Sequence, residues 1–302
     1  MEYITLLLAS VCFTGQFAFT KLFERGVRQT VTTSLVMVAI SNLVGAAMYF
    51  VISGFSVSFS PASLFWETAL ALVTVPYYVI GIKVLSLGSL AIYSMFMMLG
   101  GMLVPFIYGL FTLGEEITVG KMIGIVLLSI FIILQAVWQS KPDEKSGNAT
   151  AKERYLFFAL CIVIFILNGL TGVIAKAHQL STDAVDEVSF TATACAITSF
   201  ISGIMLLLLA LFKKESRCDM RASVKLSPLL NTLFIGAFAY TGSFLHLKAA
   251  AVLEASIQFP LVSGVVILLS AFCSFAVFRE KISAKEWISV AGACASTVLF
   301  AF

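Results

Sequence analysis

Long apolar runs alternate with short polar stretches along the whole chain. We count ten such runs, at residues 3–20, 31–53, 63–82, 88–113, 117–138, 155–175, 188–212, 227–247, 255–278 and 284–302. A helix needs about 20 apolar residues to cross the hydrocarbon core of a bilayer. Lipid offers no hydrogen bonds to the backbone, so each run predicts a transmembrane helix, and the short alternating pattern of barrel strands is absent. The expected fold is an all-α polytopic membrane protein with ten transmembrane helices.

The longest polar stretch divides these ten runs into two sets of five. It covers residues 139–154 and carries Pro, Gly, Ser and mixed charge, which is typical of a solvated linker. We therefore predict a first five-helix repeat at residues 1–138, a linker at 139–153 and a second five-helix repeat at 154–302. Because five is an odd number, the second repeat enters the membrane in the opposite sense, which makes the two halves an inverted repeat.

One segment of the first half recurs in the second. Residues 83–137 align without a gap on residues 248–302, and each copy has a lone Lys, a long apolar run, a Glu in a short polar turn and another apolar run. The alignment pairs Lys83 with Lys248 and Glu115 with Glu280. An internal duplication in an apolar chain is typical of a transporter built from two halves.

Composition narrows the function classes. The chain has 302 residues, 60% hydrophobic and 12% charged, with mean hydropathy +1.03 and a net charge of +3. A soluble domain has roughly 25% charged residues, and nothing here indicates a nucleic-acid groove. The six Cys lack CxxC spacing, the two His are too few for a histidine metal cluster, and HExxH, GxSxG and Walker A motifs are absent. We expect no enzyme activity, catalytic residue, cofactor or metal, and we expect no removable signal peptide, because no small-residue cleavage site follows the first run.

Orientation follows from the distribution of Lys and Arg. Sixteen of the 19 basic residues lie after the odd-numbered runs, and the others are Lys121, Lys176 and Lys248. The positive-inside rule therefore predicts cytoplasmic odd loops, with both termini outside, in a multi-pass protein of the plasma (inner) membrane.

The two Glu turns carry a resemblance to a known family. With "LGEEIT" at 113–118, "FREKIS" at 278–283 and the lysines Lys83 and Lys248, the chain resembles the drug/metabolite transporter superfamily, specifically ten-helix proteins with two EamA-type halves. The resemblance implies a central cavity between the halves, alternating access, and substrates drawn from amino acids, nucleosides, sugars, polyamines and drugs. Two departures are the unequal places of Pro105 and Pro260 in their runs and the predicted outside termini.

Polar side chains inside the apolar runs are the candidates for a substrate site, because burying them without a partner costs several kcal/mol. Tyr93 and Gln258 occupy equivalent places in the repeats, as do Tyr78 and Ser243. The alternative for each residue is a hydrogen bond to a neighbouring helix. The candidate substrate-binding residues are Gln16, Tyr77, Tyr78, Tyr93, Asn168, Tyr240, Ser243 and Gln258.

The charged candidates have structural alternatives as well. Glu115 and Glu280 are interpreted as caps beside helix N-termini. Lys83 and Lys248 either extend to the interface or bond helix-end carbonyls, and Lys21 and Lys176, which end the first helix of each half, are interpreted in the same way. His246 is the candidate for proton coupling, with a hydrogen-bonded packing role as its alternative.

The leading functional hypothesis is a secondary carrier for a small polar, zwitterionic or aromatic metabolite. Its alternatives are a multidrug efflux pump for hydrophobic cations and a sensor or scaffold without flux. The first run has no embedded carboxylate, so the mechanism of the small multidrug resistance relatives does not carry over, although Glu67 or Glu254 could serve a cation. Glycines 100, 101, 169 and 172 predict close helix approach. Expected partners are the substrate and the bilayer, with monomer and homodimer both open.

Overall fold

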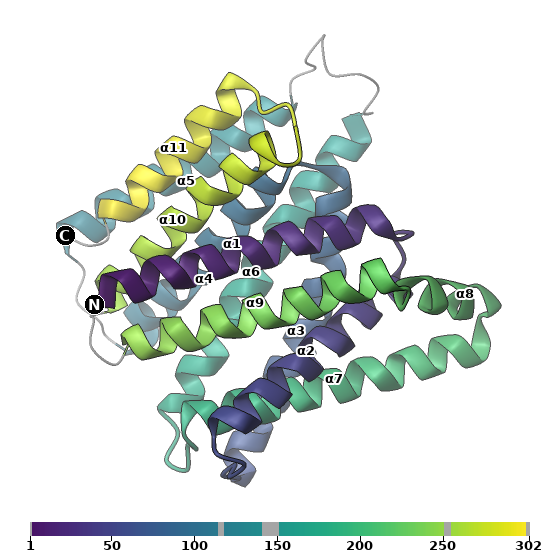
Figure 1. The fold of residues 1–302 in the computed structure, drawn as a ribbon. Helices are drawn as coiled ribbons and strands as arrows, with labels where there is room; N and C mark the ends of the chain where they lie inside the picture. The colour runs from purple at the N-terminus through teal and green to yellow at the C-terminus, as the bar shows by residue number, and fades with distance from the viewer. Residues whose placement is uncertain (1, 114–117, 141–150, 251–254, 300–302) are drawn as a thin grey trace. The chain divides into compact units, whose positions relative to one another are not determined.

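A computed structural model describes residues 2–113, 118–140, 151–250 and 255–299, in which every regular element is an α-helix (Figure 1). The helices are α1 (Glu2–Gly26), α2 (Val31–Ile52), α3 (Pro61–Leu87), α4 (Leu90–Leu113), α5 (Val119–Ser140), α6 (Ala151–Gln179), α7 (Glu187–Phe212), α8 (Lys214–Ser223), α9 (Leu226–Ala250), α10 (Ala255–Ala276) and α11 (Ala284–Leu299).

Each apolar run of the sequence lies on one of these helices. Seven helices in the described ranges are long and apolar enough to cross a membrane, namely α1, α2, α3, α4, α6, α7 and α9. Shorter apolar stretches lie in α5 and α10. The prediction of an all-helical polytopic membrane protein is confirmed, since a chain with this many apolar helices needs lipid around it.

Helix α8 was not predicted. It occupies the polar connection after the seventh apolar run, and its ten residues, KESRCDMRAS, contain five charges and no long apolar stretch. Such a segment is typical of a surface helix, so a search for apolar runs passes over it. The structure holds it in place because it packs on α2 and α7, and the Arg217 guanidinium donates to the Ala210 carbonyl at the end of α7 (2.6 Å).

Local sequence signals set both ends of α2. At its start, Thr30 and Thr33 form a capping box in which each side chain accepts from the other's backbone N–H, at 3.3 and 3.1 Å. At its end, Gly54 has a φ of +66°, and the N–H groups of Gly54 and Phe55 donate to the carbonyls of Val51 and Phe50. The Phe55 ring also packs against the Phe50 ring. This is a Schellman motif, which needs glycine at the left-handed position.

Asp186 caps the start of α7, and we expect Asp186→Ala to lower the free energy of unfolding by about 1 kcal/mol or less near neutral pH. Its carboxylate accepts from the Ser189 N–H at 2.9 Å. Burial raises the pKa of Asp186, but hydrogen bonds from Ser189 and Val188 outweigh it, so the net pKa is lowered. The contribution is therefore full above the unfolded pKa of about 3.9 and is lost as the pH falls through the lower folded value.

Thermal unfolding of wild type and Asp186→Ala between about pH 3 and 7 checks this expectation. The difference in Tm should narrow towards the acid end. Asp183→Ala, at an exposed position in the same loop, is the control. A Tm difference that stays constant with pH would contradict a role for the carboxylate charge.

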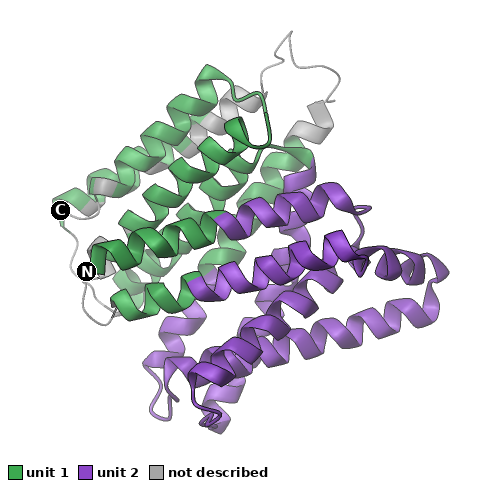
Figure 2. Cartoon of the chain, in the orientation of Figure 1, with its two compact units in different colours: residues 1–14, 87–169, 242–302 green, residues 15–86, 170–241 purple. Residues whose placement is uncertain are grey.

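The helices group into two units, shown in Figure 2. Unit 1 comprises residues 1–14, 87–169 and 242–302, and therefore takes helices from both sequence halves. Within it α10 packs along α4, and α11 packs along α5 and α10. Helix α5 begins at Val119 and α11 at Ala284, which is the offset that carries residue 83 to 248. Helices at aligned positions of the two sequence halves, α4 with α10 and α5 with α11, are thus neighbours in unit 1.

Unit 2 comprises residues 15–86 and 170–241. Its most extensive helix pair is α2 with α7, the second helix of each sequence half. An apolar core holds the unit together, and its members include Phe23, Leu35, Met37, Ile82, Leu206 and Ile235. Polar and titratable side chains also lie inside this unit, on α1, α2, α3, α6, α7 and α9.

Candidate functional site

A tyrosine and an asparagine from different sequence halves meet inside unit 2. The Tyr240 hydroxyl on α9 donates to the Asn42 side-chain carbonyl on α2 at 2.7 Å. Asn42 is 2% exposed, and its amide donates to the Val38 carbonyl at 2.9 Å. Gly45 makes room for the tyrosine ring, because a Cβ there would lie 2.3 Å from Tyr240 Cε2. The contact therefore depends on the residue types of both helices.

Further aromatic and thiol groups extend this contact. The Tyr49 ring meets the Tyr240 ring edge-on, with centroids 6.2 Å apart, and the Cys195 thiol of α7 lies near the Tyr240 side chain. The adjacent α3 residues Tyr77 and Tyr78 form an edge-to-face pair at 4.9 Å, and Tyr78 packs against the apolar core. We call Asn42, Tyr49, Tyr78, Cys195 and Tyr240 the tyrosine cluster.

Of the five residues in this cluster, the sequence predicted only Tyr78 and Tyr240 as substrate-binding residues. Asn42 is visible in the sequence as a polar residue in an apolar run, which is the signal that selects such positions. Tyr49 lies near the end of its run and Cys195 resembles a small hydrophobic residue, so neither carries a distinguishing signal in the sequence. Only the packing of α2, α7 and α9 identifies these two.

Removing the Tyr240 hydroxyl tests how much this contact stabilises the protein. Tyr240→Phe leaves the Asn42 carbonyl oxygen buried and without its donor, which we expect to cost about 1–3 kcal/mol of unfolding free energy. Tyr155→Phe, at a tyrosine 67% exposed, is the matched control and should change stability by less than about 0.5 kcal/mol. Equal Tm values for the two variants would show that the hydrogen bond adds nothing.

Polar side chains of unit 1 form separate contacts. The Gln258 amide, 1% exposed, donates to the His246 carbonyl at 2.7 Å. The His246 ring meets Phe13 and Phe259 edge-on at 6.3 and 5.2 Å, and its Nε2 is buried without a hydrogen-bond partner in the described part of the chain. Asn168 donates to the Met97 carbonyl at 2.6 Å, joining α6 to α4.

The predicted substrate-binding residues thus divide between the units. Gln16, Tyr77, Tyr78 and Tyr240 belong to unit 2, and Tyr93, Asn168, Ser243 and Gln258 belong to unit 1, as does His246. Gln16, Tyr77, Tyr93 and Gln258 are buried, and Tyr78, Asn168, Tyr240 and Ser243 are half-buried. None of these eight side chains is fully exposed. Each could therefore hydrogen-bond either a ligand or a neighbouring helix.

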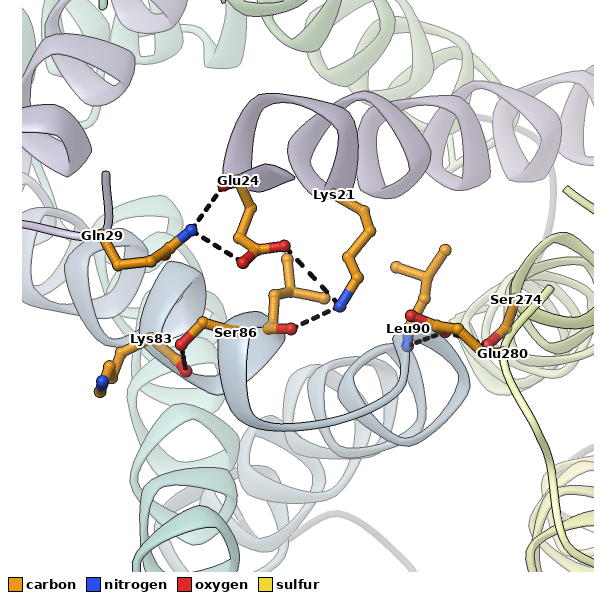
Figure 3. A network of polar contacts seen from close by, with 9 residues as sticks. Lys21, Glu24, Gln29, Lys83, Ser86, Leu90, Ser274 and Glu280 are labelled. Atoms are coloured by element: carbon orange, nitrogen blue, oxygen red, sulfur yellow. Dashed lines mark hydrogen bonds and ion pairs between the residues drawn. The ribbon is translucent and has the colours of Figure 1, made fainter. Parts of the chain in front are cut away.

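Lys21 makes a buried charged contact in the last part of α1 (Figure 3). Its ammonium donates to the Leu85 carbonyl, in the last turn of α3, at 2.5 Å. It also lies 3.8 Å from the Glu24 carboxylate, which accepts from the Gln29 amide at 2.7 Å. A lysine at a helix C-terminus can hydrogen-bond a carbonyl that has no partner within the helix, and the helix dipole stabilises its positive charge. One of the two chemistries considered for Lys21, bonding of a helix-end carbonyl, is therefore present.

Glu280 lies at the start of a helix of the other sequence half (Figure 3). Its carboxylate accepts from the Leu90 N–H, the first residue of α4, at 3.0 Å, and from the Ser274 hydroxyl. A carboxylate at this place accepts from one of the N–H groups that have no partner within the helix, and the N-terminal end of the helix dipole stabilises its negative charge. Glu115, the equivalent residue of the first half, lies outside the described residues.

The two lysines of the family motif, Lys83 and Lys248, are exposed. Lys83 points away from the buried network in Figure 3, and its own carbonyl accepts from Ser86 at 2.7 Å. The Lys248 ammonium lies 4.7 Å from the centroid of the Phe244 ring, one turn earlier on α9. In the described ranges no group of three or more His, Cys, Asp or Glu side chains is placed to hold a metal ion.

Comparisons with known proteins agree with this architecture. The profile of the EamA-like transporter family matches residues 153–302. A protein of known crystal structure shares 17% identity with the chain at a TM-score of 0.59, over 99% of this chain and 96% of the other. At that identity the likeness concerns the fold alone. No curated protein matches the chain. On the match to its second half, the chain belongs to the EamA-like transporter family of the drug/metabolite transporter superfamily and is a multi-pass membrane transporter protein.

Proposed function

We propose that the protein is a secondary carrier that moves a small polar, zwitterionic or aromatic metabolite across the plasma membrane by alternating access. The observation that carries this proposal is the tyrosine cluster, in which Asn42 and Tyr49 of the first sequence half meet Tyr240 and Cys195 of the second. A polar group shared by both halves at membrane depth is where a carrier of two repeats would hold its substrate.

The chemistry of the cluster favours the proposed substrate class. Phenol hydroxyls and an amide donate and accept hydrogen bonds without carrying charge, and the tyrosine rings offer faces on which an aromatic or apolar group can stack. The cluster itself contains no carboxylate that would select a hydrophobic cation. A small molecule with hydrogen-bonding groups and a flat or apolar part is the best complement.

Helix pairing supports the two-half mechanism. Helices α2 and α7, α4 and α10, and α5 and α11 hold corresponding places in the two sequence halves, and each pair packs together. An inverted repeat would bring equivalent helices together around its pseudo-two-fold axis. We therefore propose that residues 1–138 and 154–302 are the two repeats and that transport proceeds by their movement around a midplane site.

The position of α8 supports the proposed orientation. The helix follows α7, on the side that the lysine and arginine count assigns to the cytoplasm, and it carries Lys214, Arg217 and Arg221. Basic residues next to membrane helices are retained on the cytoplasmic side. We propose that α8 lies at the cytoplasmic surface and that both termini lie outside.

A thermal-shift screen of the purified full chain tests the function. The panel holds amino acids, nucleosides, sugars, amines and cationic dyes, because a ligand at 100 times its Kd adds about 2.7 kcal/mol of stability. We expect one metabolite class to raise the Tm of wild type and of Tyr155→Phe, and to lose its effect in Tyr78→Ala and Tyr240→Ala, which alter the tyrosine cluster. Transport of that metabolite into proteoliposomes is the second readout.

Two other outcomes would contradict the proposal. Stabilisation by hydrophobic cations alone would indicate multidrug efflux. No stabilisation by any compound, together with no flux of the panel compounds into proteoliposomes, would favour a sensor or scaffold.

A further inference from the structure

Positive charge is concentrated in α8 and the residues on either side of it. Residues 213–225 hold five basic and two acidic side chains, so their net charge of +3 equals that of the whole chain. All five basic side chains are exposed, and they are Lys213, Lys214, Arg217, Arg221 and Lys225. Figure 1 shows α8 between the end of α7 and the start of α9, two helices of membrane length. The charges therefore lie where these two helices leave the hydrocarbon core.

The basic and acidic side chains of α8 lie on different faces of the helix. Successive residues of an α-helix are turned by about 100°, which places Lys214, Arg217 and Arg221 within about 60° of one another. Glu215 and Asp219 are turned by more than about 100° from the centre of that group. We call Lys214, Arg217 and Arg221 the basic stripe.

Packing within unit 2 fixes the rotation of α8. Ser216 and Ser223 are buried, and Met220 packs against the apolar core of the unit. These three residues share one face, so the basic stripe points away from the core. Arg217 Nε donates to the Ala210 carbonyl at 2.6 Å, which leaves the Nη hydrogens of the guanidinium for another acceptor.

The basic stripe brings like charges together without an internal counterion. Arg217 and Arg221 are four residues apart and Lys214 is three residues before Arg217, and like charges at these helical spacings repel. Among the described residues Lys214 and Arg221 have no carboxylate within ion-pair distance, whereas Lys21 has Glu24. An anion from outside the chain would relieve this repulsion.

Exposed apolar side chains flank the basic stripe on either side in the chain. Leu211 and Phe212, which end α7, are 68% and 83% exposed, and Leu226, which begins α9, is 74% exposed. A basic helix face next to exposed apolar side chains is typical of segments that lie in the interface of an anionic bilayer. A soluble anion would gain nothing from these apolar side chains, whereas a phospholipid offers acyl chains to them.

We propose that the basic stripe binds the phosphate group of an anionic phospholipid in the adjacent leaflet. The Arg217 and Arg221 guanidinium groups offer paired N–H donors to phosphate oxygens, and the Lys214 ammonium adds a third positive charge. A zwitterionic phospholipid fits less well, because its own ammonium group offsets the charge of its phosphate. The site lies on the surface of unit 2 and is independent of the proposed carrier function.

Titration of the detergent-solubilised full chain with single phospholipids, followed by native mass spectrometry, tests the site. Wild type should bind phosphatidylglycerol several-fold more tightly than phosphatidylcholine with the same acyl chains. The double variant Lys214→Gln, Arg221→Gln should weaken phosphatidylglycerol binding by more than about tenfold, because each basic residue near an anionic surface adds about fivefold. It should leave phosphatidylcholine binding unchanged. Arg217 is retained because of its contact with α7.

Two further double variants control for net charge and for folding. Lys281→Gln, Lys285→Gln removes the same charge from two exposed lysines of another connection and should keep the affinity of wild type. Glu215→Gln, Asp219→Asn removes the acidic residues of α8 and should strengthen phosphatidylglycerol binding several-fold. This second variant decides the question if the basic-stripe variant does not fold.

Alkylation of Cys218 shows whether the lipid is bound at α8. Of the six cysteines only Cys218 is exposed, and it lies one turn after Lys214 on the same face. Phosphatidylglycerol should slow its reaction with a neutral maleimide several-fold in wild type, and phosphatidylcholine should not. The protection should be lost in Lys214→Gln, Arg221→Gln.

Four results would overturn the lipid site. They are equal affinity of wild type for the two phospholipids, equal weakening in the basic-stripe variant and the Lys281, Lys285 control, no gain on removal of the acidic residues, and no protection of Cys218. Inorganic phosphate at millimolar concentration is the last arm. If it protects Cys218 as well as phosphatidylglycerol does, the basic stripe binds a soluble anion and the lipid assignment is wrong.

Discussion

Lys21→Met is expected to lower the free energy of unfolding by about 3–5 kcal/mol, because it removes the ammonium group beside a buried carboxylate. The Lys21 and Glu24 side chains are 7% and 11% exposed, and their charged atoms lie 3.8 Å apart. The variant also removes the donor to the Leu85 carbonyl at the end of α3. Unfolding of the purified protein, followed by temperature or by denaturing detergent, gives the difference.

Two further variants show whether the buried charge causes the loss. The double variant Lys21→Met, Glu24→Gln removes both charges and should regain much of the lost stability. Lys83→Met, at an exposed lysine of α3, should change stability by less than about 0.5 kcal/mol. A loss in Lys21→Met below about 1 kcal/mol would contradict this prediction, because that is the range of exposed ion pairs.

Gly100→Ala is expected to have the other large effect on stability. Helices α4 and α6 approach so closely that a Cβ on Gly100 would lie 2.2 Å from the Phe165 carbonyl oxygen, and one on Gly169 would lie 2.2 Å from Val104 Cβ. A backbone carbonyl cannot turn aside as a side chain can, so the helices must separate. Overpacking of this kind costs about 1–3 kcal/mol or more.

Gly203→Ala is the matched control for this prediction. Gly203 lies within α7, where an added Cβ would meet no atom within 4 Å. Alanine is also the better helix former, by about 0.5–1 kcal/mol. The Tm of Gly100→Ala should fall, and that of Gly203→Ala should stay or rise. Similar changes in both variants would show that helix propensity, and not the crossing of α4 and α6, decides the outcome.

The polar residues within the apolar runs show how much of a candidate site a single sequence can predict. Gln258 and Asn168 stand out because an amide in an apolar run is costly without a partner, and each donates to a carbonyl of another part of the chain. No local pattern identifies such a partner.

The sequence by itself determined the class of the protein. Apolar runs of membrane length dictate helices, because lipid leaves the backbone no other hydrogen-bond partner. Thr30 marks the start of α2 and Gly54 follows its end. The recurrence of residues 83–137 also anticipates the common offset of α5 and α11.

Tertiary structure alone decided which polar groups meet. Glu280 follows α10 in the chain but accepts from the first N–H of α4, and Lys21, not Lys83, bonds the end of α3. The sequence of α8 predicts a polar loop, but the structure contains a helix there that packs on α2 and α7. Periodicity reports which face of a helix is apolar, whereas hydrogen bonds between helices depend on their separation and rotation, which arise from packing of the whole chain.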